Sequence, residues 1–390
     1  MTSAGSKRSV GWMGLKRGHR AKPLEWLGEK IIFLVSLSAI LMIFLIFVFI
    51  GREALPILTG TMNSALIQQV IPVADLDKLT EPQIREYLGL TKTQFAAMDR
   101  DTLRELMQLK ADATRESSQN PDARINSTQW RYLLGAHQWQ GYSKPEYIWQ
   151  PVSEVPKYNI VPLVIGSLKV TFVALLLAVP LALGAAIYVS QLARPRVREI
   201  AKPVIELLAG IPSVVLGFFA LIIMASFLQQ VFGYQSRLNA LGAGIALGFS
   251  VIPVVFSIAE DALTSVPRSY VQAALALGAS KWKAAWQVVL PAALPGVFAA
   301  IALGFGRAIG ETMIVLMASG NASIVSASLF DSTRTITATI AAELGEVVFG
   351  SPHYRILFLI GVLLFAVTFL TNLAGDLIMH RLRARIEGKR

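Results

Sequence analysis

The stretch "AALPGVFAAIALGFGRAIGETMIVLMASG", residues 292 to 320, decides the fold of this 390-residue chain. It is apolar over a length that crosses a bilayer, because ~20 helical residues span the hydrocarbon core. Two ionisable residues, Arg307 and Glu311, nevertheless lie inside it. A charged side chain at the centre of a membrane costs at least ~3 kcal/mol, so it faces a protein interior or a wet cavity. One face of this helix is therefore expected to lie away from lipid.

Five further apolar segments accompany this one. The six predicted spans cover roughly residues 31–50, 161–189, 204–228, 241–258, 292–318 and 356–379. The first is expected to be a retained helix, since its apolar core is too long for a secretory signal and no small-residue cleavage site follows. Cysteine is absent and the four histidines are scattered, which predicts no disulfide and no metal site. The sequence thus predicts an all-α polytopic membrane protein.

Basic residues set the predicted orientation. They precede the first span and recur between spans two and three, between spans four and five, and after the last span (Lys7, Arg8, Lys16, Arg17, Arg20, Lys22, Lys30; Arg194, Arg196, Arg198, Lys202; Arg268, Lys281, Lys283; Arg381, Arg383, Arg385, Lys389, Arg390). Such segments stay in the cytoplasm, so both termini are predicted to be cytoplasmic. The net charge of +11 then faces anionic lipid, and nucleic acid is not needed to explain it.

This orientation predicts the organisation of the chain. The parts are a basic cytoplasmic segment (1–30), a first transmembrane helix (31–50), an extracytoplasmic insertion (51–160), a core with five spans (161–380) and a basic cytoplasmic tail (381–390). In the insertion, Thr80 is a predicted N-cap and the following residues favour two or three helices. The aromatic residues between Trp139 and Tyr158 are expected to form a belt at the membrane surface.

The cytoplasmic segment 264–290, between spans four and five, carries the most specific pattern. Its central part reads "SYVQAALALGASKWKAAWQVVLP", residues 269 to 291. Helix-favouring residues begin at Tyr270, Gly278 interrupts them, and a second helical stretch begins at Ser280. Four apolar residues are expected to press on the membrane domain, namely Val271, Ala274, Leu275 and Leu277. Two short helices that project from the membrane are therefore predicted.

The spacing inside this segment resembles the EAA motif of ABC importer permeases. Gln272-Ala273-Ala274 is followed after three residues by Gly278, and nine further residues lead to Val288-Val289-Leu290-Pro291. The resemblance implies a coupling helix that docks in a groove of a cytoplasmic ATPase. The coupling residues it implies are Gln272, Ala273, Ala274, Gly278, Leu290 and Pro291. Glutamine stands at 272 where the family usually has glutamate, which removes a salt bridge but not the docking shape.

Two longer stretches are similar to phosphate-importer permeases of the PstC and PstA type, and more to PstC. They are "IELLAGIPSVVLGFFAL", residues 205 to 221, and "LGFGRAIGETMIVLMASGN", residues 303 to 321. The resemblance implies the transmembrane domain of a type I ABC importer in the plasma (inner) membrane. It places Arg307, Glu311 and Thr312 on the path of inorganic phosphate. Glu206 is a further candidate, for an inner gate.

The same resemblance implies the partners. They are a second, PstA-like permease subunit in a heterodimer, with a homodimer left open, two ATPase subunits and an extracytoplasmic phosphate-binding protein. The chain lacks a Gly-x-x-x-x-Gly-Lys-Ser/Thr loop and any catalytic arrangement, so it is expected to be a non-catalytic subunit. It is expected to bind no cofactor, with ATP and Mg used by the partner ATPase.

Alternatives remain open at this level. Arg307 presents a planar fork of donors that matches an oxyanion, but Arg307 and Glu311, four residues apart on one helix face, also suit a structural ion pair. A secondary transporter would explain the charges in the membrane without an ATPase. A membrane-bound phosphate-sensing scaffold would use the large external loop as its input. A membrane enzyme is disfavoured, since the spans hold no catalytic constellation.

Overall fold

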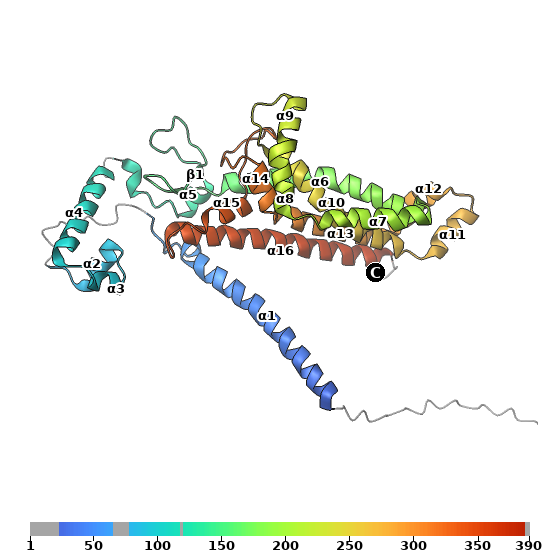
Figure 1. The fold of residues 1–390 in the computed structure, drawn as a ribbon, viewed down its shortest axis with the longest axis horizontal. Helices are drawn as coiled ribbons and strands as arrows, with labels where there is room; N and C mark the ends of the chain where they lie inside the picture. Colours follow the sequence, from blue (N-terminus) through green and yellow to red (C-terminus); the bar gives the residue numbers. More distant parts are fainter. Residues whose placement is uncertain (1–22, 65–77, 118–119, 387–390) are drawn as a thin grey trace, which may run out of the picture. The chain divides into compact units, whose positions relative to one another are not determined.

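The computed structural model describes residues 23–64, 78–117 and 120–386 and is almost wholly helical (Figure 1). Most of the predicted basic N-terminal segment, and the last four residues of the tail, lie outside these ranges. Within them, six helical segments have the length and composition to cross a membrane: Leu27–Leu58, Val161–Leu192, Ser213–Phe232, Ala240–Thr264, Lys281–Ile309 and Pro352–Ile378. The predicted all-α polytopic fold is confirmed.

The chain divides into two units, Met1–Phe49 and Ile50–Arg390. In the first unit, helix α1 (Pro23–Leu58) presents apolar side chains that are exposed at every position from Ile31 to Phe49. An apolar helix of this kind is expected to be surrounded by lipid. The helix begins before and ends after the predicted 31–50, so residues 23–30 are helical as well.

In the second unit, the external insertion begins with three short helices. They are α2 (Glu81–Leu88), α3 (Lys92–Ala96) and α4 (Arg100–Ser117). Thr80 is the N-cap of α2, as predicted, and its backbone N–H donates to the Gln83 side chain at 2.9 Å. This hydrogen bond satisfies a backbone donor that would otherwise be left free at the start of the helix.

The rest of the insertion folds around its aromatic residues instead of exposing them. A 3-10 turn η2 (Pro121–Arg124), helix α5 (Trp130–Leu134) and the antiparallel strands β1 (Trp149–Gln150) and β2 (Lys157–Tyr158) enclose these rings. Trp139, Trp149 and Tyr158 are buried. The predicted belt at the membrane surface is therefore wrong for these three residues. The Trp149 indole N–H donates to Glu343 at 3.1 Å, so the burial of its polar atom is satisfied.

The core of the membrane domain is the contact between α6 (Val161–Ile187) and α10 (Ala240–Thr264). Alanines recur every fourth residue along α6 and are fully buried (Ala174, Ala178, Ala182 and Ala186). Across from them, a Cβ added to Gly244 would lie 2.5 Å from Val173. Small residues on both helices thus allow the backbones to approach closely, which is how helices associate in membranes.

The third span begins later than predicted. Residues 204–209 belong to the amphipathic helix α7 (Pro195–Ala209), which follows the π-helical turn η3 (Tyr188–Leu192). The span itself comprises α8 (Ser213–Phe219), the π-helical turn η4 (Ala220–Met224) and α9 (Ala225–Phe232). Pro212 lacks an N–H and disfavours a helical conformation at the residue before it, which separates α7 from α8.

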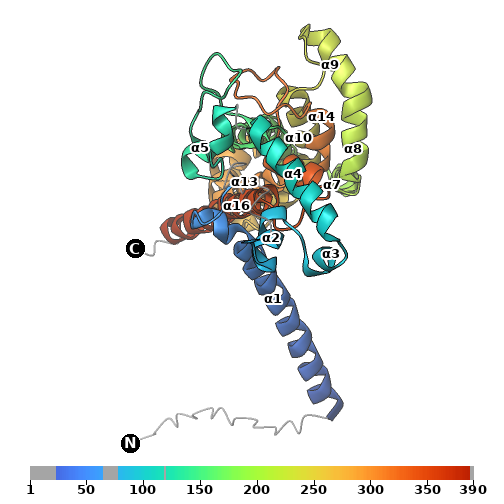
Figure 2. The ribbon, with the colours of Figure 1, turned by 90° about the vertical axis from the view of Figure 1, so that its left-hand side faces the viewer.

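Residues 268–386 form the remaining helices of the membrane domain. It contains α11 (Arg268–Ala276), α12 (Lys281–Ala284), the π-helical turn η5 (Ala285–Val289), α13 (Leu290–Ile309), α14 (Met313–Ala318), α15 (Ile336–Glu343) and α16 (Pro352–Ile386). In the end-on view of Figure 2, α13 and α16 run next to each other. The helical segment that contains the fifth span is Lys281–Ile309, so it begins before the predicted 292 and ends before the predicted 318.

Candidate functional site

A break at the end of the fifth span, between α13 and α14, creates the candidate site. Helix α13 ends at Ile309, and Glu311 and Thr312 are not helical. One carboxylate oxygen of Glu311 accepts the backbone N–H of Met313 at 3.2 Å, the first residue of α14. A side chain that bonds to nearby backbone in this way competes with continuation of the helix. The prediction of one continuous helix through residue 318 is therefore wrong.

The ion pair persists across this break. Arg307 Nη2 lies 3.1 Å from the other carboxylate oxygen of Glu311, Oε2. Only 4% of the Glu311 side chain is exposed, against 46% of the Arg307 side chain in this single chain. The Glu311 carboxylate therefore holds one edge of the guanidinium and leaves part of it accessible.

Hydrogen bonds connect the backbone of Glu311 to α15, and α15 in turn to α6. The Thr337 hydroxyl donates to the Glu311 carbonyl at 2.7 Å, and it lies 3.2 Å from the hydroxyl of Thr335. The backbone N–H of Ile336 in turn donates to Ser167 of α6 at 3.0 Å. The backbone of Glu311 is thus held by a buried hydroxyl, and Arg307 is the more exposed partner of the pair.

The position of the pair along the bundle follows from Gly304. A Cβ added to Gly304 would lie 2.5 Å from Val255 and 3.4 Å from Val251, which are central residues of α10. Arg307 is one helical turn beyond Gly304. At ~1.5 Å per residue, the Arg307 backbone lies within about 5 Å of the middle of α10 along the helix axis. A cation at this depth is not expected to face lipid.

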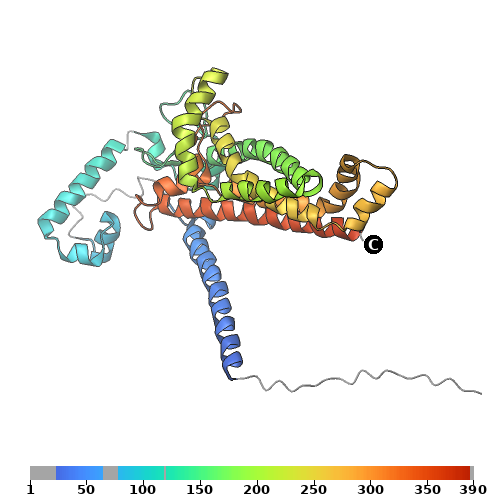
Figure 3. The same cartoon turned by 45° about the vertical axis from the view of Figure 1, so that its right-hand side comes forward.

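The cytoplasmic segment forms the second candidate site. Helices α11 and α12 project at the end of the molecule where α16 also ends (Figure 3). Between them Gly278 has φ +84°, a left-handed conformation that glycine adopts without strain. Gln272 and Ala273 are exposed, whereas Ala274 is half-buried. Leu277 is 90% exposed and does not press on the membrane domain as predicted.

The cytoplasmic segment joins the membrane domain at the start of α13. Leu290 packs against the buried core and follows the π-helical turn η5, and Pro291 comes next, so the helix continues past a residue that has no N–H to donate. Two exposed aromatic rings just before α13, Trp282 and Trp286, were not predicted from the sequence; their centroids are 5.7 Å apart. Their spacing of four residues was the available signal.

A buried carboxylate near the cytoplasmic segment was also missed. Glu260 of α10 is 1% exposed and accepts hydrogen bonds from Arg198 at 2.8 Å, Lys202 at 2.7 Å and Thr264 at 2.9 Å. The hydrogen bond with Glu260 raises the pKa of Lys202 above its usual value. Since the folded-state pKa is raised, this contribution to stability is present at neutral pH and is lost only in strongly alkaline solution. Glu260 therefore ties α7 to α10.

Glu260→Ala is expected to lower the free energy of unfolding by about 2–3 kcal/mol, since it leaves two cations without their buried partner. Asp261→Asn is the matched control. Asp261 is 68% exposed and pairs with Lys202 at 3.1 Å, so its loss should cost less than about 1 kcal/mol. Thermal unfolding in detergent measures both variants. Equal midpoints for the two would contradict a structural role for Glu260.

Glu206 lies in a different helix from Arg307 of the ion pair. It is an exposed residue of α7, not of the third span, and accepts a long hydrogen bond of 3.4 Å from Ser257 of α10. The structure thus places Glu206 with the cytoplasmic helices.

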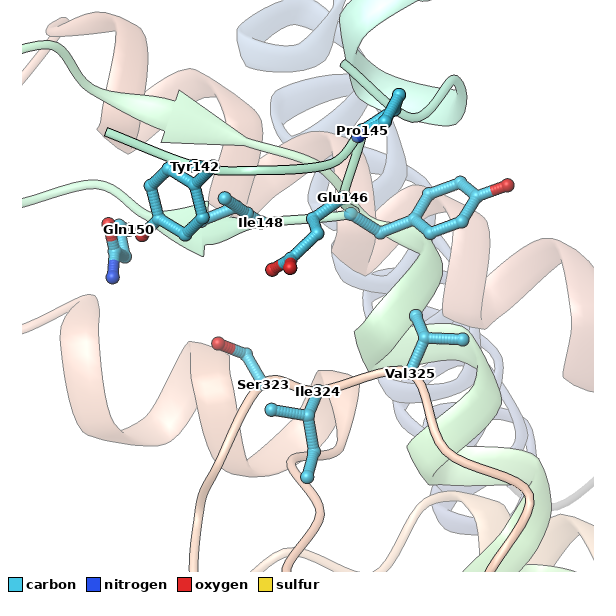
Figure 4. Close-up of a pocket in the computed structure, with 9 residues that line it drawn as sticks. Tyr142, Pro145, Glu146, Ile148, Gln150, Ser323, Ile324 and Val325 are labelled. Atoms are coloured by element: carbon cyan, nitrogen blue, oxygen red, sulfur yellow. Dashed lines mark hydrogen bonds between the residues drawn. The ribbon is translucent and has the colours of Figure 1, made fainter. Parts of the chain in front are cut away.

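An external cavity of about 580 Å³ separates the insertion from the loop after α14. Figure 4 shows Glu146 and Tyr142 on one side and Ser323 and Ile324 on the other, with the Glu146 carboxylate directed toward the gap. Glu146 is the one charged residue among those that line it. The carboxylate of Glu146 repels anions, so the described lining of this cavity does not favour an oxyanion.

Six candidate spans, a membrane-embedded ion pair and a projecting cytoplasmic helix pair define a polytopic membrane protein of the permease class. The family model described as binding-protein-dependent transport system inner membrane component matches residues 178–388. The chain belongs to this family. It is thus a multi-pass inner-membrane component of a transport system that depends on a binding protein.

Relatives and solved structures add detail. A probable ABC transporter permease protein, YqgH, of Bacillus subtilis is 36% identical over 222 residues, which cover 57% of this chain and 72% of the relative. The phosphate transport system permease protein PstC of Mesorhizobium japonicum is 34% identical over 256 residues, or 61% and 77% of the two chains. The inward-facing MetNI methionine ABC transporter matches with 20% identity and a TM-score of 0.45 over 57% of this chain and 95% of the other.

Proposed function

We propose that this chain is a permease subunit of an ATP-driven importer and that it forms part of the path for inorganic phosphate. The single observation that carries the proposal is the Arg307–Glu311 pair, held near the middle of α10 with nearly half of the arginine side chain exposed. The similarity to PstC proteins, which are phosphate transport permeases by name, supports phosphate as the anion.

Arg307 is the group suited to the substrate. Its guanidinium offers planar donors that match two oxygens of a tetrahedral anion. Glu311 does not have to move, since its carboxylate also accepts the N–H of Met313 and its carbonyl accepts the Thr337 hydroxyl. The guanidinium exchanges its contact with Glu311 for the anion and returns to it afterwards. Thr312, which lies in the same break, is proposed to contact the anion as well.

The proposed energy source lies outside this chain. An extracytoplasmic binding protein delivers phosphate, and two ATPase subunits use ATP and Mg²⁺. They act on the projecting helices through Gln272, Ala273, Ala274 and Gly278, and α13 transmits the motion through Leu290 and Pro291. A second permease subunit, PstA-like in the proposed heterodimer, closes the path on the exposed side of Arg307. Glu206 is proposed to act at the inner gate.

Reconstitution of the complex in liposomes tests this function. Phosphate uptake is expected only when ATP, the binding protein and all subunits are present, and an equal concentration of sulfate is expected to compete at least about tenfold less well. Uptake that continues without the ATPase would instead show a secondary transporter. Assembly without any uptake, together with a phosphate-dependent change in the external loop, would favour a sensing scaffold.

A further inference from the structure

A second polar group lies beside the ion pair, on the last helix. Asn372 of α16 is exposed, and a Cβ added to Gly306 would lie 3.7 Å from its Oδ1 atom. Nearby, a Cβ on Gly375 would lie 3.0 Å from Ala302. Residues 372–375 therefore run alongside residues 302–306, and the Asn372 amide is level with the residue that precedes Arg307.

The Asn372 amide has no hydrogen-bond partner among the residues that the structure describes. Its polar neighbours on α16 differ, since Thr368 and Thr371 donate to backbone carbonyls of the same helix, at 3.1 Å to Leu364 and 2.8 Å to Val367. An amide without a partner in hydrocarbon costs several kcal/mol. Asn372 is therefore not expected to face lipid, and its partner is water or a polar ligand.

The amide also borders the exposed face of α13. Leu303, Arg307 and Gly310 are four and three residues apart, so they share one face of the helix, and all three are exposed. Gly306 lies next to this face, and Asn372 Oδ1 is the nearest atom that a Cβ added there would meet. The accessible part of the Arg307 side chain and the Asn372 amide thus open onto the same side of the α13–α16 pair.

We propose that Asn372 is a second binding group for the oxyanion on the translocation path. The inference rests on the proposed function and extends it. The amide NH₂ donates to an anion oxygen, while Oδ1 accepts a hydrogen bond from a hydroxyl group of the anion. Phosphate near neutral pH keeps at least one such hydroxyl and sulfate keeps none. Asn372 therefore favours a protonated oxyanion, which a cationic side chain alone does not distinguish.

The absence of cysteine from this chain allows a direct test. In the assembled complex, Asn372→Cys is expected to react with a membrane-impermeant, negatively charged methanethiosulfonate, and phosphate with ATP is expected to slow the reaction. Leu370→Cys is the matched control. Leu370 is also exposed in this chain but lies about 200° around the helix. It is expected to face lipid and to stay unmodified, as does the parent chain, which has no cysteine.

Transport supplies the second readout. Asn372→Leu is expected to reduce phosphate uptake about tenfold and to narrow the preference for phosphate over sulfate, with assembly and nucleotide binding unchanged. Asn372→Cys that stays unmodified in every state, or that reacts no faster than Leu370→Cys, would overturn the inference. If Asn372→Cys reacts and phosphate protects it while Arg307→Ala transports normally, the role of Asn372 stands and the proposed role of Arg307 falls.

Discussion

Arg307→Ala is expected to reduce ATP-driven phosphate uptake by at least about a hundredfold in the reconstituted complex. Each charge-assisted hydrogen bond contributes about 1.5–3 kcal/mol, and a guanidinium forms two of them with a tetrahedral anion. The variant also leaves the buried Glu311 carboxylate without its cation, and its charge then repels the substrate. Initial rates of radiolabelled phosphate uptake measure the effect. Arg307→Lys keeps the charge without the planar fork and should fall between wild type and Arg307→Ala.

A double variant separates the substrate path from a structural ion pair. Arg307→Ala alone leaves a buried charge unpaired, so it lowers stability whichever role the pair has. Arg307→Ala with Glu311→Gln removes both charges and is expected to recover stability in both cases. Uptake should stay low if Arg307 binds the anion, and it should recover together with stability if the pair is structural. Wild-type uptake by Arg307→Ala alone would remove Arg307 from the path.

Hydrophobic segments predicted the membrane fold well because a bilayer imposes a simple requirement on length and composition. The ends of the helices depended on finer chemistry. At residues 210–212, a glycine and a proline interrupt an apolar run. The run is apolar on both sides of this interruption, so the predicted third span wrongly included the end of the amphipathic α7. At residues 310–312, the break involves a hydrogen bond that the Met313 N–H donates to the Glu311 carboxylate. Hydrophobicity carries no information about that bond.

Some residues of the candidate sites could likewise be predicted from the sequence and others could not. Arg307 and Glu311 were predictable, because a charge inside an apolar run needs a reason whatever the surrounding structure. Glu260 was not, since a carboxylate at the end of a span resembles an ordinary surface residue until Arg198 and Lys202 of another helix are placed around it. Trp149 was misjudged for a related reason. Its partner Glu343 is 194 residues away in the sequence.

Gly278→Val is expected to reduce ATP-driven uptake at least tenfold while the membrane domain still folds. Gly278 has φ +84°, and a β-branched residue adopts that conformation only with strain. The N–H groups of Gly278 and Ala279 donate to the carbonyls of Leu275 and Ala274, each at 3.0 Å, so this turn sets the direction of α12 relative to α11. Strain here changes the surface offered to the ATPase. Uptake and ATP hydrolysis, measured on the same liposomes, should show transport falling further than hydrolysis.

Gly278→Asn is the matched control, because asparagine tolerates the left-handed conformation and has a side chain of similar size. Within the part of the chain that the structure describes, no atom outside the immediate turn lies within 4 Å of a Cβ added at this position, so crowding there does not separate the two variants. If the turn matters, Gly278→Asn should retain most of the uptake that Gly278→Val loses. If both variants fail equally and the ATPase no longer binds, the position itself contacts the ATPase and any side chain blocks docking. Wild-type coupling in both would show that the ATPase acts on the membrane domain elsewhere.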